Sequence, residues 1–237
     1  MPVTDILNTQ FEKKATRDGY GAGLVEIGAE NPKVVVLEAD LSGSTKTKKF
    51  SEKYPDRFFN YGVAEQNLIG QAAGFALSGM IPVASSFAMF AAGRAWEIFR
   101  NSVGYPHLNV KVAATHAGIT LGEDGASHQI IEDIALMRAL PGMTVYQPAD
   151  DIETKQIVDY LCKTNEPAYL RLTRQNLDRV HHVWQISGRR IIAGMSYLGQ
   201  WEQRCLDMIH ELSNEGDYLY VGQLPPLLDR SEERRVG

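Results

Sequence analysis

The sequence predicts an α/β protein with a mostly parallel sheet and helices on both faces of that sheet. Apolar runs rich in β-branched residues recur along the chain, as the buried strands of parallel sheets do. Stretches with helical signals lie between these runs, which favours strand-helix-strand units. The 44% of hydrophobic and 22% of charged residues are typical of an ordinary folded protein.

The expected elements follow in chain order. Thr4 is placed to cap a first helix. A buried helix is expected from Glu65, and Pro82 with the glycines before it separates this helix from the strand that follows. A later helix begins near His128 and ends at Pro141-Gly142. Strands are expected at 34–37, 81–84, 110–115, 144–146 and 168–172.

One more helix is marked by its capping residues. Asp150 and Glu153 resemble a capping box, in which two side chains bond to the free backbone amides of a first helical turn. This helix is expected to end before Asn165. Beyond residue 177 the pattern is irregular. We therefore expect a domain at 1–177 and, at 178–237, an aberrant tail that is a truncated or frameshifted remnant of a further domain, ending in the adapter-like RSEERRVG.

Charge and composition exclude several classes of partner. The formal net charge of −5 gives no global basic field, so no nucleic-acid partner is expected. The stretch between Glu65 and Arg94 carries no charge, but its glycines and Pro82 break it, so no membrane span is expected. No secretory signal is visible, and the two cysteines follow no disulfide or zinc spacing, which favours the cytoplasm.

Glu65 is the first candidate for chemistry. It is the only acidic residue between Asp56 and Glu97, and it opens a helix of mostly small and apolar residues. A carboxyl group there is either desolvated, with a raised pKa, or paired with a group that the sequence does not identify. A structural alternative is a glutamate that interacts with the helix dipole.

Phe87 and Phe90 form the second candidate group. They are three residues apart, so on a helix they would share one face and could form a flat shelf for a heteroaromatic ring. Core packing is the alternative explanation for two such aromatic residues.

The segment ATHAGITLGEDGASHQIIED forms the third candidate group. It places His116, Glu123, Asp124 and His128 on a glycine-rich stretch after a strand, a usual setting for ligand contacts. Binding of substrate hydroxyls with a histidine moving protons is one reading, and capping or surface histidines are the other. Because the spacing matches no zinc site, no metal ligand is predicted in this chain.

The motifs RFFNYGVAEQN, SSFAMF and GITLGEDGASHQ, in this order, resemble the pyrimidine-binding domain of transketolase. The likeness is closest to the C-terminal subunit of split transketolases, and it covers the chain up to about Leu177. It implies thiamine diphosphate as cofactor. Glu65 then matches the catalytic glutamate at N1′ of the aminopyrimidine, Phe87 and Phe90 match the aromatic residues on that ring, and Asp40 matches an aspartate near the cofactor.

The same resemblance implies the substrate residues. His116 and His128 match histidines of the substrate channel, and Asp124 matches the aspartate that recognises a hydroxyl group of the donor sugar. Departures put phosphate recognition in doubt, since Gln147 stands where many transketolases have an arginine. Arg94, Arg171 or Arg174 could take over that role, and Arg174 is our choice. Gly93 replaces a third aromatic residue.

The family's Gly-Asp-Gly motif for Mg²⁺ and the diphosphate is not found, so the resemblance implies a second chain that binds them. That partner is an N-terminal diphosphate-binding transketolase subunit, in a homodimer or heterotetramer. The implied activity moves a two-carbon ketol unit from a ketose or its phosphate to an aldose or its phosphate, in the pentose phosphate pathway.

Four alternatives remain open beside this activity. The chain could be a 1-deoxyxylulose-5-phosphate synthase-like or a 2-oxoacid dehydrogenase beta-like subunit, which share the glutamate. It could also be a non-catalytic interaction subunit or an inactive fragment. A dinucleotide-binding protein is disfavoured, because no Gly-x-Gly-x-x-Gly follows the first predicted strand.

Overall fold

The computed structural model describes residues 12–179, 183–187 and 218–222. Glu12–Arg179 form one compact unit. Thr4 and the last eight residues, on which two predictions rest, lie outside the described residues. The expected division at residue 177 stays a prediction, close to the end of this unit.

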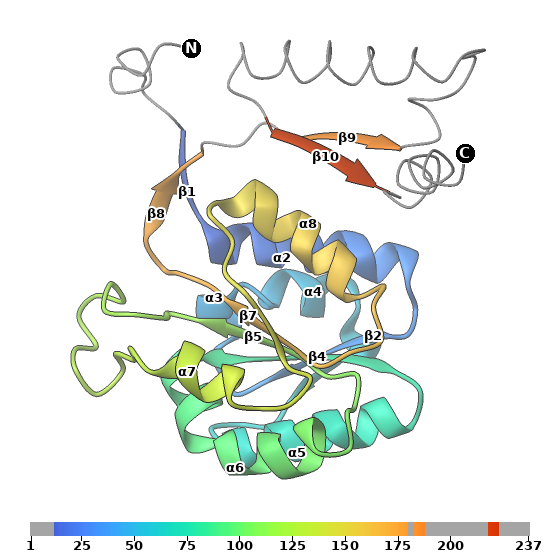
Figure 1. Cartoon of the computed structure of the whole chain (residues 1–237), viewed down its shortest axis with the longest axis vertical. Coiled ribbons are helices and arrows are strands. Elements are labelled where there is room, and N and C mark those ends of the chain that lie inside the picture. The colour runs from blue at the N-terminus through green and yellow to red at the C-terminus, as the bar shows by residue number, and fades with distance from the viewer. Residues whose placement is uncertain (1–11, 180–182, 188–217, 223–237) are drawn as a thin grey trace, which may run out of the picture. The chain divides into compact units, whose positions relative to one another are not determined.

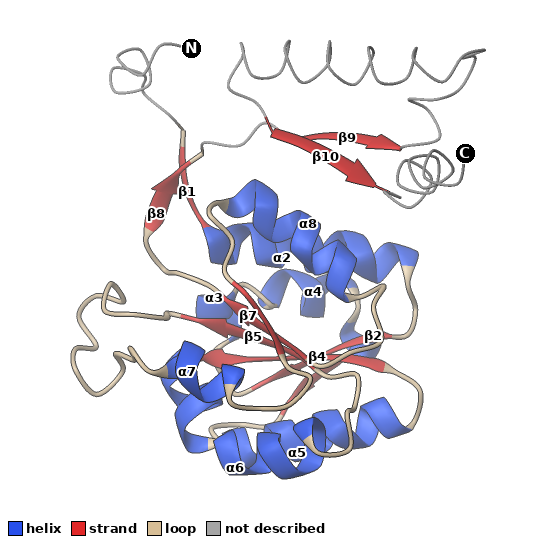
Figure 2. Ribbon diagram, viewed as in Figure 1, coloured by secondary structure: helices blue, strands red, loops and turns tan. Residues whose placement is uncertain are grey.

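The unit is built on a six-stranded sheet whose neighbouring strands all run parallel (Figure 2). This confirms the predicted fold class and the five predicted strands, and adds one short strand, β3. The order across the sheet is β3-β2-β4-β5-β7-β6. The bounds are β2 Val34–Glu38, β3 Phe58–Asn60, β4 Ile81–Phe87, β5 Lys111–Thr115, β6 Thr144–Tyr146 and β7 Ala168–Arg171.

Helices cover both faces of this sheet (Figure 1). One face carries α2 (Thr16–Glu30), α4 (Lys48–Lys53) and α8 (Asp151–Leu161), and the other carries α5 (Glu65–Leu77), α6 (Trp96–Phe99) and α7 (Asp133–Arg138). The short helix α3 (Ser42–Thr45) follows β2. Single turns of other helix types complete the unit: 3-10 helix η1 (Pro55–Arg57) and π-helices η2 (Met89–Arg94) and η3 (Arg100–Gly104).

The core consists of two layers, one on each face of the sheet. Alternate residues of β2 show why, because successive side chains of a strand point to opposite faces. Val34 and Val36 pack with Tyr20 and Leu24 of α2, whereas Leu37 packs on the α5 side. Since both faces are buried, the strands read as continuous apolar runs.

The predicted cap of α8 is confirmed. The Asp150 carboxylate accepts hydrogen bonds from the backbone amides of Ile152 and Glu153, at 3.0 and 2.9 Å. Glu153 accepts from the amide of Ala149 at 2.6 Å. The free amides of the first turn are thereby satisfied, and this is why the helix begins there.

The start predicted for the helix near His128 is wrong. The helix, α7, begins at Asp133. The residues before it form a loop, closed by a bridge between Gly118 and Ile130. The first described helix, α2, begins at Thr16 and is rich in glycine, whereas the helix predicted from Thr4 lies outside the described residues.

Two further strand pairs are described. β1 (Lys13–Ala15) and β8 (Asn176–Asp178) pair antiparallel within the compact unit. Beyond Arg179, β9 (Val183–Ser187) and β10 (Tyr218–Gly222) pair parallel to each other. The predicted aberrant character of the tail is not decided by this pair. None of the helices in the described ranges is long and apolar enough to cross a membrane.

The order of the strands marks one place on the sheet edge. From β2 the chain moves to β3 on one side and then crosses to β4 on the other side of β2. Parallel α/β sheets bind ligands beyond the carboxyl ends of the strands at such a reversal. Asp40, Phe87 and His116 lie at or just past the ends of β2, β4 and β5, which directs attention to this edge.

The contact between α2 and α8 provides a test of the fold. A methyl group added at Gly19 would lie 2.1 Å from the carbonyl oxygen of Asp151, whereas one at Gly74 of α5 would meet nothing within 4 Å. We expect Gly19→Ala to lower the free energy of unfolding by about 2 kcal/mol or more, because two backbones must separate. Gly74→Ala, the matched control, should leave it unchanged or slightly raised. Denaturant unfolding measures both, and an equal effect would contradict the packing.

Candidate active site

Glu65 is buried at the first position of α5 and is paired with an arginine. Its side chain is 1% exposed, and its Oε2 atom accepts a hydrogen bond of 2.8 Å from Nη1 of Arg94, whose side chain is 49% exposed. The prediction left open whether this carboxyl group has a partner, and Arg94 is that partner. The Arg94 guanidinium also lies over the Phe90 ring, 4.8 Å from its centroid.

Arg94 ends the π-helix η2, which explains how it reaches Glu65. A π-helix adds a residue to the turn and rotates the side chains that follow it. The small residues Ala91, Ala92 and Gly93 precede Arg94 there. The ion pair therefore links the first turn of α5 to the segment that follows β4.

The two phenylalanines adjoin, but not as predicted. Phe87 ends β4 and Phe90 lies in η2, so the expectation of one shared helical face is wrong. Their rings are nonetheless close to parallel, with 6.3 Å between centroids and 18° between planes. Phe87 is buried and Phe90 half-buried. An aromatic shelf forms because the strand passes directly into the π-helix.

The two predicted histidines lie against this shelf. The His116 ring is 3.9 Å from the Phe87 ring, and the His128 ring is 5.1 Å from the Phe90 ring, in an edge-on arrangement. His116 adopts a left-handed backbone with φ of 59°, which few side chains adopt without a tertiary reason. The structure thus brings both histidines together with both phenylalanines.

His116 is held as a neutral imidazole. Its Nε2 lies 3.2 Å from Nη1 of Arg17, and since arginine can only donate, Nε2 is the acceptor. Nδ1 therefore carries the proton and donates to the hydroxyl of Thr115 at 2.9 Å. Burial lowers the pKa of His116 to about 4, and the charges of Arg17 and Arg174 lower it further. At neutral pH the ring can accept a proton only when a ligand alters its surroundings.

The loop between β5 and α7 carries Asp124, which is 39% exposed. Its carboxylate is therefore accessible. Nη1 of Arg174 lies 3.9 Å from Oδ2 of Asp124 and donates to the carbonyl of Leu121 at 2.5 Å. Gly122, at φ 101°, leaves room for this guanidinium.

Asp40 lies at the same edge, just after β2, and is exposed. It exchanges two hydrogen bonds with Asn60 of β3: its amide donates to the Asn60 side chain at 3.1 Å, and its carboxylate accepts from it at 3.0 Å. Its left-handed φ of 63° is fixed by this pair. Within the described ranges, no hydrogen bond or ion pair joins Asp40 to the other predicted site residues.

Arg17 is the residue that the sequence analysis missed. It lies in the first turn of α2, donates to the carbonyl of Ser44 at 3.0 Å, and adjoins His116. Its Nε is buried and makes no hydrogen bond to any described residue. A single arginine at the start of a helix gives no sequence signal, and only the fold brings it to residue 116.

Two of the three arginines proposed for phosphate recognition are already engaged. Arg94 pairs with Glu65, as described. Arg171 donates from Nε to the buried Asp133 at 2.7 Å and from Nη1 to Gln147 at 2.6 Å. Arg174 is the one that faces the loop of Asp124, so our choice of Arg174 stays a prediction that the geometry allows.

One face of α5 is left open by the described part of the chain. Leu68, Ile69, Ala72 and Ala73 are buried in the core. Gly70 and Gly74 are exposed on the opposite face, where a methyl group added at either would meet nothing within 4 Å. The exposed polar residues of the helix are Gln66, Asn67 and Gln71.

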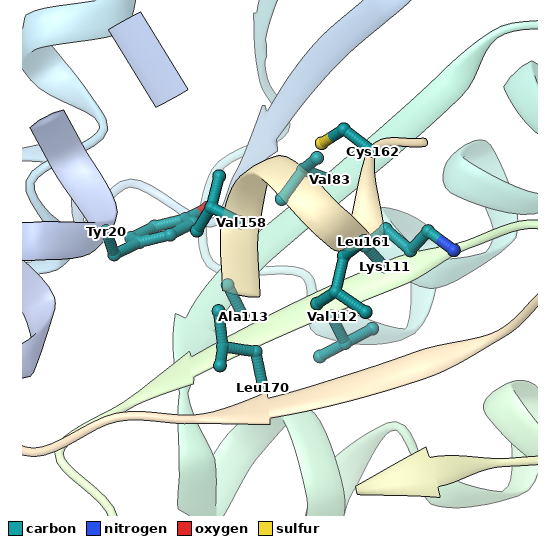
Figure 3. Close-up of a pocket in the computed structure, with 9 residues that line it drawn as sticks. All are labelled: Tyr20, Val83, Lys111, Val112, Ala113, Val158, Leu161, Cys162 and Leu170. Carbon is teal, nitrogen blue, oxygen red and sulfur yellow. The ribbon is translucent and has the colours of Figure 1, made fainter. Parts of the chain in front are cut away.

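A small cavity lies elsewhere, between α8 and the sheet (Figure 3). Lys111 reaches it from the first residue of β5, and burial lowers the pKa of this lysine to about 8. Its ammonium group donates to Thr164 and to the Glu166 carbonyl. The cavity contains none of the predicted site residues. Its lining is Tyr20, Val83, Lys111, Val112, Ala113, Val158, Leu161, Cys162 and Leu170.

No group of three or more histidine, cysteine, aspartate or glutamate side chains that could hold a metal ion occurs in the described part of the chain.

Comparison with known families places this edge in context. Residues 12–179 match the family Transketolase, pyrimidine binding domain. A protein of Methanocaldococcus jannaschii, provisionally described as a transketolase C-terminal section, is 56% identical over 71% of this chain and 53% of its own length. The 6-deoxy-6-sulfo-D-fructose transketolase subunit SqwH of a Clostridium species is 38% identical over 73% of this chain and 55% of its own length.

Solved structures give the same picture. A split-gene transketolase, described as an inactive beta4 tetramer, is 46% identical with a TM-score of 0.66, covering 89% of this chain and 71% of that chain. The Pichia stipitis transketolase in complex with sedoheptulose-7-phosphate is 25% identical with a TM-score of 0.64, covering 89% and 34%. The chain thus spans only about half the length of the two curated relatives described above.

The ion pair between Glu65 and Arg94 can be tested by a double-mutant cycle on the isolated chain. We expect a coupling of about 1–3 kcal/mol between Glu65→Gln and Arg94→Met in the free energy of unfolding, because a buried carboxylate loses its only described partner. Arg100→Met is a control, since Arg100 is exposed and stacks 5.9 Å from the Trp96 ring. A coupling near zero would show that the pair contributes nothing.

Proposed function

The chain belongs to the transketolase family through its pyrimidine-binding domain, and we propose that it is one subunit of a two-chain transketolase. In this proposal the assembled enzyme moves a two-carbon ketol unit from a ketose phosphate to an aldose phosphate with thiamine diphosphate. The observation that carries it is Glu65, a carboxyl group buried at the start of α5 and joined through Arg94 to an aromatic shelf. Cytoplasmic pentose phosphate metabolism is the setting we propose.

The residues at this edge fit the aminopyrimidine half of the cofactor. Phe87 and Phe90 offer near-parallel rings of the kind that a flat heterocycle packs against. Glu65 would hold a proton at a ring nitrogen of that heterocycle. Ser86, directly before Phe87, has a buried hydroxyl with no partner in the described residues, so a polar ligand group could meet it. When bound, thiamine diphosphate supplies the carbon nucleophile that carries the two-carbon unit.

Arg94 sets a condition on this arrangement. Because its guanidinium donates to Oε2 of Glu65, a ligand nitrogen would either share the carboxylate with Arg94 or displace this half-exposed arginine. Either outcome keeps the carboxylate fixed at the helix terminus. Arg94 would then act on the position of Glu65 and not on the substrate.

A second chain is proposed to complete the site. The open face of α5 carries two glycines, which would let the backbone of another chain approach closely. The packing of the apolar residues on the buried face does not explain why glycines stand on the open one. This chain matches only about half of the length of the two related proteins. The diphosphate and Mg²⁺ are assigned to an N-terminal diphosphate-binding subunit, in a dimer or heterotetramer, since the described part of this chain offers no metal cluster.

The substrate is proposed to carry an anionic end, which Arg17 and Arg174 would hold. Both guanidinium groups lie close enough to His116 to lower its pKa, and Nε of Arg17 is buried without a described partner. An anion there would satisfy that donor and offset the two positive charges. Gln147 instead holds Arg171, so the absence of an arginine at position 147 does not remove anion recognition.

The hydroxyl groups of the sugar are assigned to His128 and Asp124. His128 lies edge-on to Phe90, and the accessible carboxylate of Asp124 lies on the same loop. His116 and His128 would accept or return protons as the carbon-carbon bond breaks and forms. Asp124 would discriminate between sugars by accepting a hydrogen bond from one hydroxyl group.

Glu65→Gln tests the leading proposal in the complex with the diphosphate-binding subunit. We expect turnover of a ketose phosphate to fall about 100-fold or more, because the carboxylate that holds the ring proton is gone. Assembly of the two chains, followed by analytical ultracentrifugation, should be unchanged. Full turnover by this variant would favour a non-catalytic interaction subunit. Turnover of pyruvate alone by the native complex would favour the synthase-like or dehydrogenase-like alternative.

Arg17→Gln tests the anionic end of the substrate. We expect kcat/KM for a ketose phosphate to fall about 10- to 100-fold, because a charge-assisted hydrogen bond is lost. For the uncharged ketose it should change little. A ketose sulfonate gives a third arm, because one relative is named for a sulfo-sugar. Lys49→Gln, on the exposed face of α4, is the control. Equal losses on charged and uncharged sugars would rule out anion binding by Arg17.

A further inference from the structure

Glu38 is a second buried carboxyl group, which the proposed reaction does not use. It ends β2, its residue is 0% exposed, and both oxygens are occupied. Oε2 accepts hydrogen bonds from the hydroxyls of Thr45 at 2.7 Å and Thr47 at 2.5 Å, and Oε1 accepts from the amide of Ala39 at 3.1 Å. No ion pair to Glu38 exists in the described ranges. Burying such a group without a counter-ion is costly, which indicates a role.

The partners of Glu38 belong to one short segment, residues 41–47, which includes α3. The amides of Ser44 and Thr45 donate to the Leu41 carbonyl at 2.8 and 2.9 Å, and Lys46 has a left-handed φ of 72°. Thr45 and Thr47 lie on either side of Lys46 and both turn towards Glu38. The carboxylate therefore ties the end of this segment to the sheet.

The same segment touches the substrate side of the site. The Ser44 carbonyl accepts from Nη1 of Arg17 at 3.0 Å, and that same nitrogen donates to His116 at 3.2 Å. Lys46 bonds to Asp18, the neighbour of Arg17, at 3.3 Å. Hydrogen bonds and adjacent residues thus connect Glu38 to His116 through Thr45, Ser44 and Arg17. A shift of the segment would move the acceptor that aims Arg17.

We propose that Glu38 is a positioning residue for the substrate: it fixes the 41–47 segment on β2, and that segment aims Arg17 beside His116. Its effect on the substrate rests on the proposed function, whereas its effect on the segment does not. Ionised, the carboxylate can accept from both threonine hydroxyls at once. Protonated, it becomes a donor as well, and one of the hydroxyls must reorient.

The groups around Glu38 allow this change to occur near neutral pH. Burial raises the pKa of Glu38 to about 7, against the lowering effect of the bonds from Thr47 and Thr45. From α2, Tyr20 faces it, and its hydroxyl is bonded to Ser85, the residue paired with Glu38 on β4. Asn60 is its neighbour on β3. None of these groups carries a charge at neutral pH, so Glu38 itself is the group that titrates.

Glu38→Gln provides the first measurement, in the complex with the diphosphate-binding subunit. Glutamine has the shape of the protonated acid, so we expect the KM for a ketose phosphate to rise about fivefold at pH 8 and to match the native value below pH 6. The value of kcat should stay within about twofold. The ratio of the two KM values cancels the titration of the substrate phosphate. Glu52→Gln, on the exposed side of α4, is the matched control.

The second measurement needs no enzyme activity. Hydrogen exchange of the full chain, followed by mass spectrometry at pH 8, should be several-fold faster for residues 41–47 in Glu38→Gln, with α8 unchanged. Thr47→Val removes one hydroxyl and keeps the carboxylate, so it should act in the same direction if Glu38→Gln folds poorly. Unchanged exchange in both variants would overturn the anchoring role.

The two measurements separate the possible failures. Faster exchange with a KM ratio of one at every pH would overturn the link from the segment to the substrate. A KM ratio that is raised equally at pH 6 and pH 8 would overturn the dependence on ionisation. A native complex that converts no ketose phosphate would defeat the proposed function, while the exchange measurement would still decide whether Glu38 holds the segment.

Discussion

The structure depends on one geometric constraint: parallel strands that lie side by side all end at the same edge of the sheet. The residues after β2, β3, β4 and β5 are far apart in the sequence, yet they must emerge together. Where the strand order reverses, the loops diverge to either side and leave space between them. Glu65, Phe87 and His116 reach this space from three different strand ends, so no single segment of the chain could build the site alone.

Charge is arranged at this edge in two separate groups. Arg94 neutralises the buried carboxylate of Glu65, on the side of the sheet that α5 covers. Burial keeps His116 neutral, and the charges of Arg17 and Arg174 lower its pKa further. The aromatic shelf lies between these groups, with Phe90 under Arg94 and Phe87 against His116. A negatively charged ligand group and a ring nitrogen would thus meet different surroundings a short distance apart.

Local signals were sufficient for much of the fold. Patterns of a few neighbouring residues predicted the five strands, the cap at Asp150 and the helix that begins at Glu65. The missed features depend on distant contacts. A glycine fits at position 19 of α2 because the backbone of α8 packs against it. Arg17 belongs to the site because it contacts His116, which lies 99 positions further along the chain. The resemblance identified Glu65, Phe87 and Phe90, but only the π-helix explains how Arg94 reaches Glu65.

The cavity of Figure 3 lies apart from the candidate site. It lies near the amino end of β5, where Lys111 is satisfied by backbone carbonyl groups, and it is separate from the residues that carry the chemistry. Substitutions among the residues that line this small void should therefore affect stability rather than the arrangement of the residues at the carboxyl edge of the sheet.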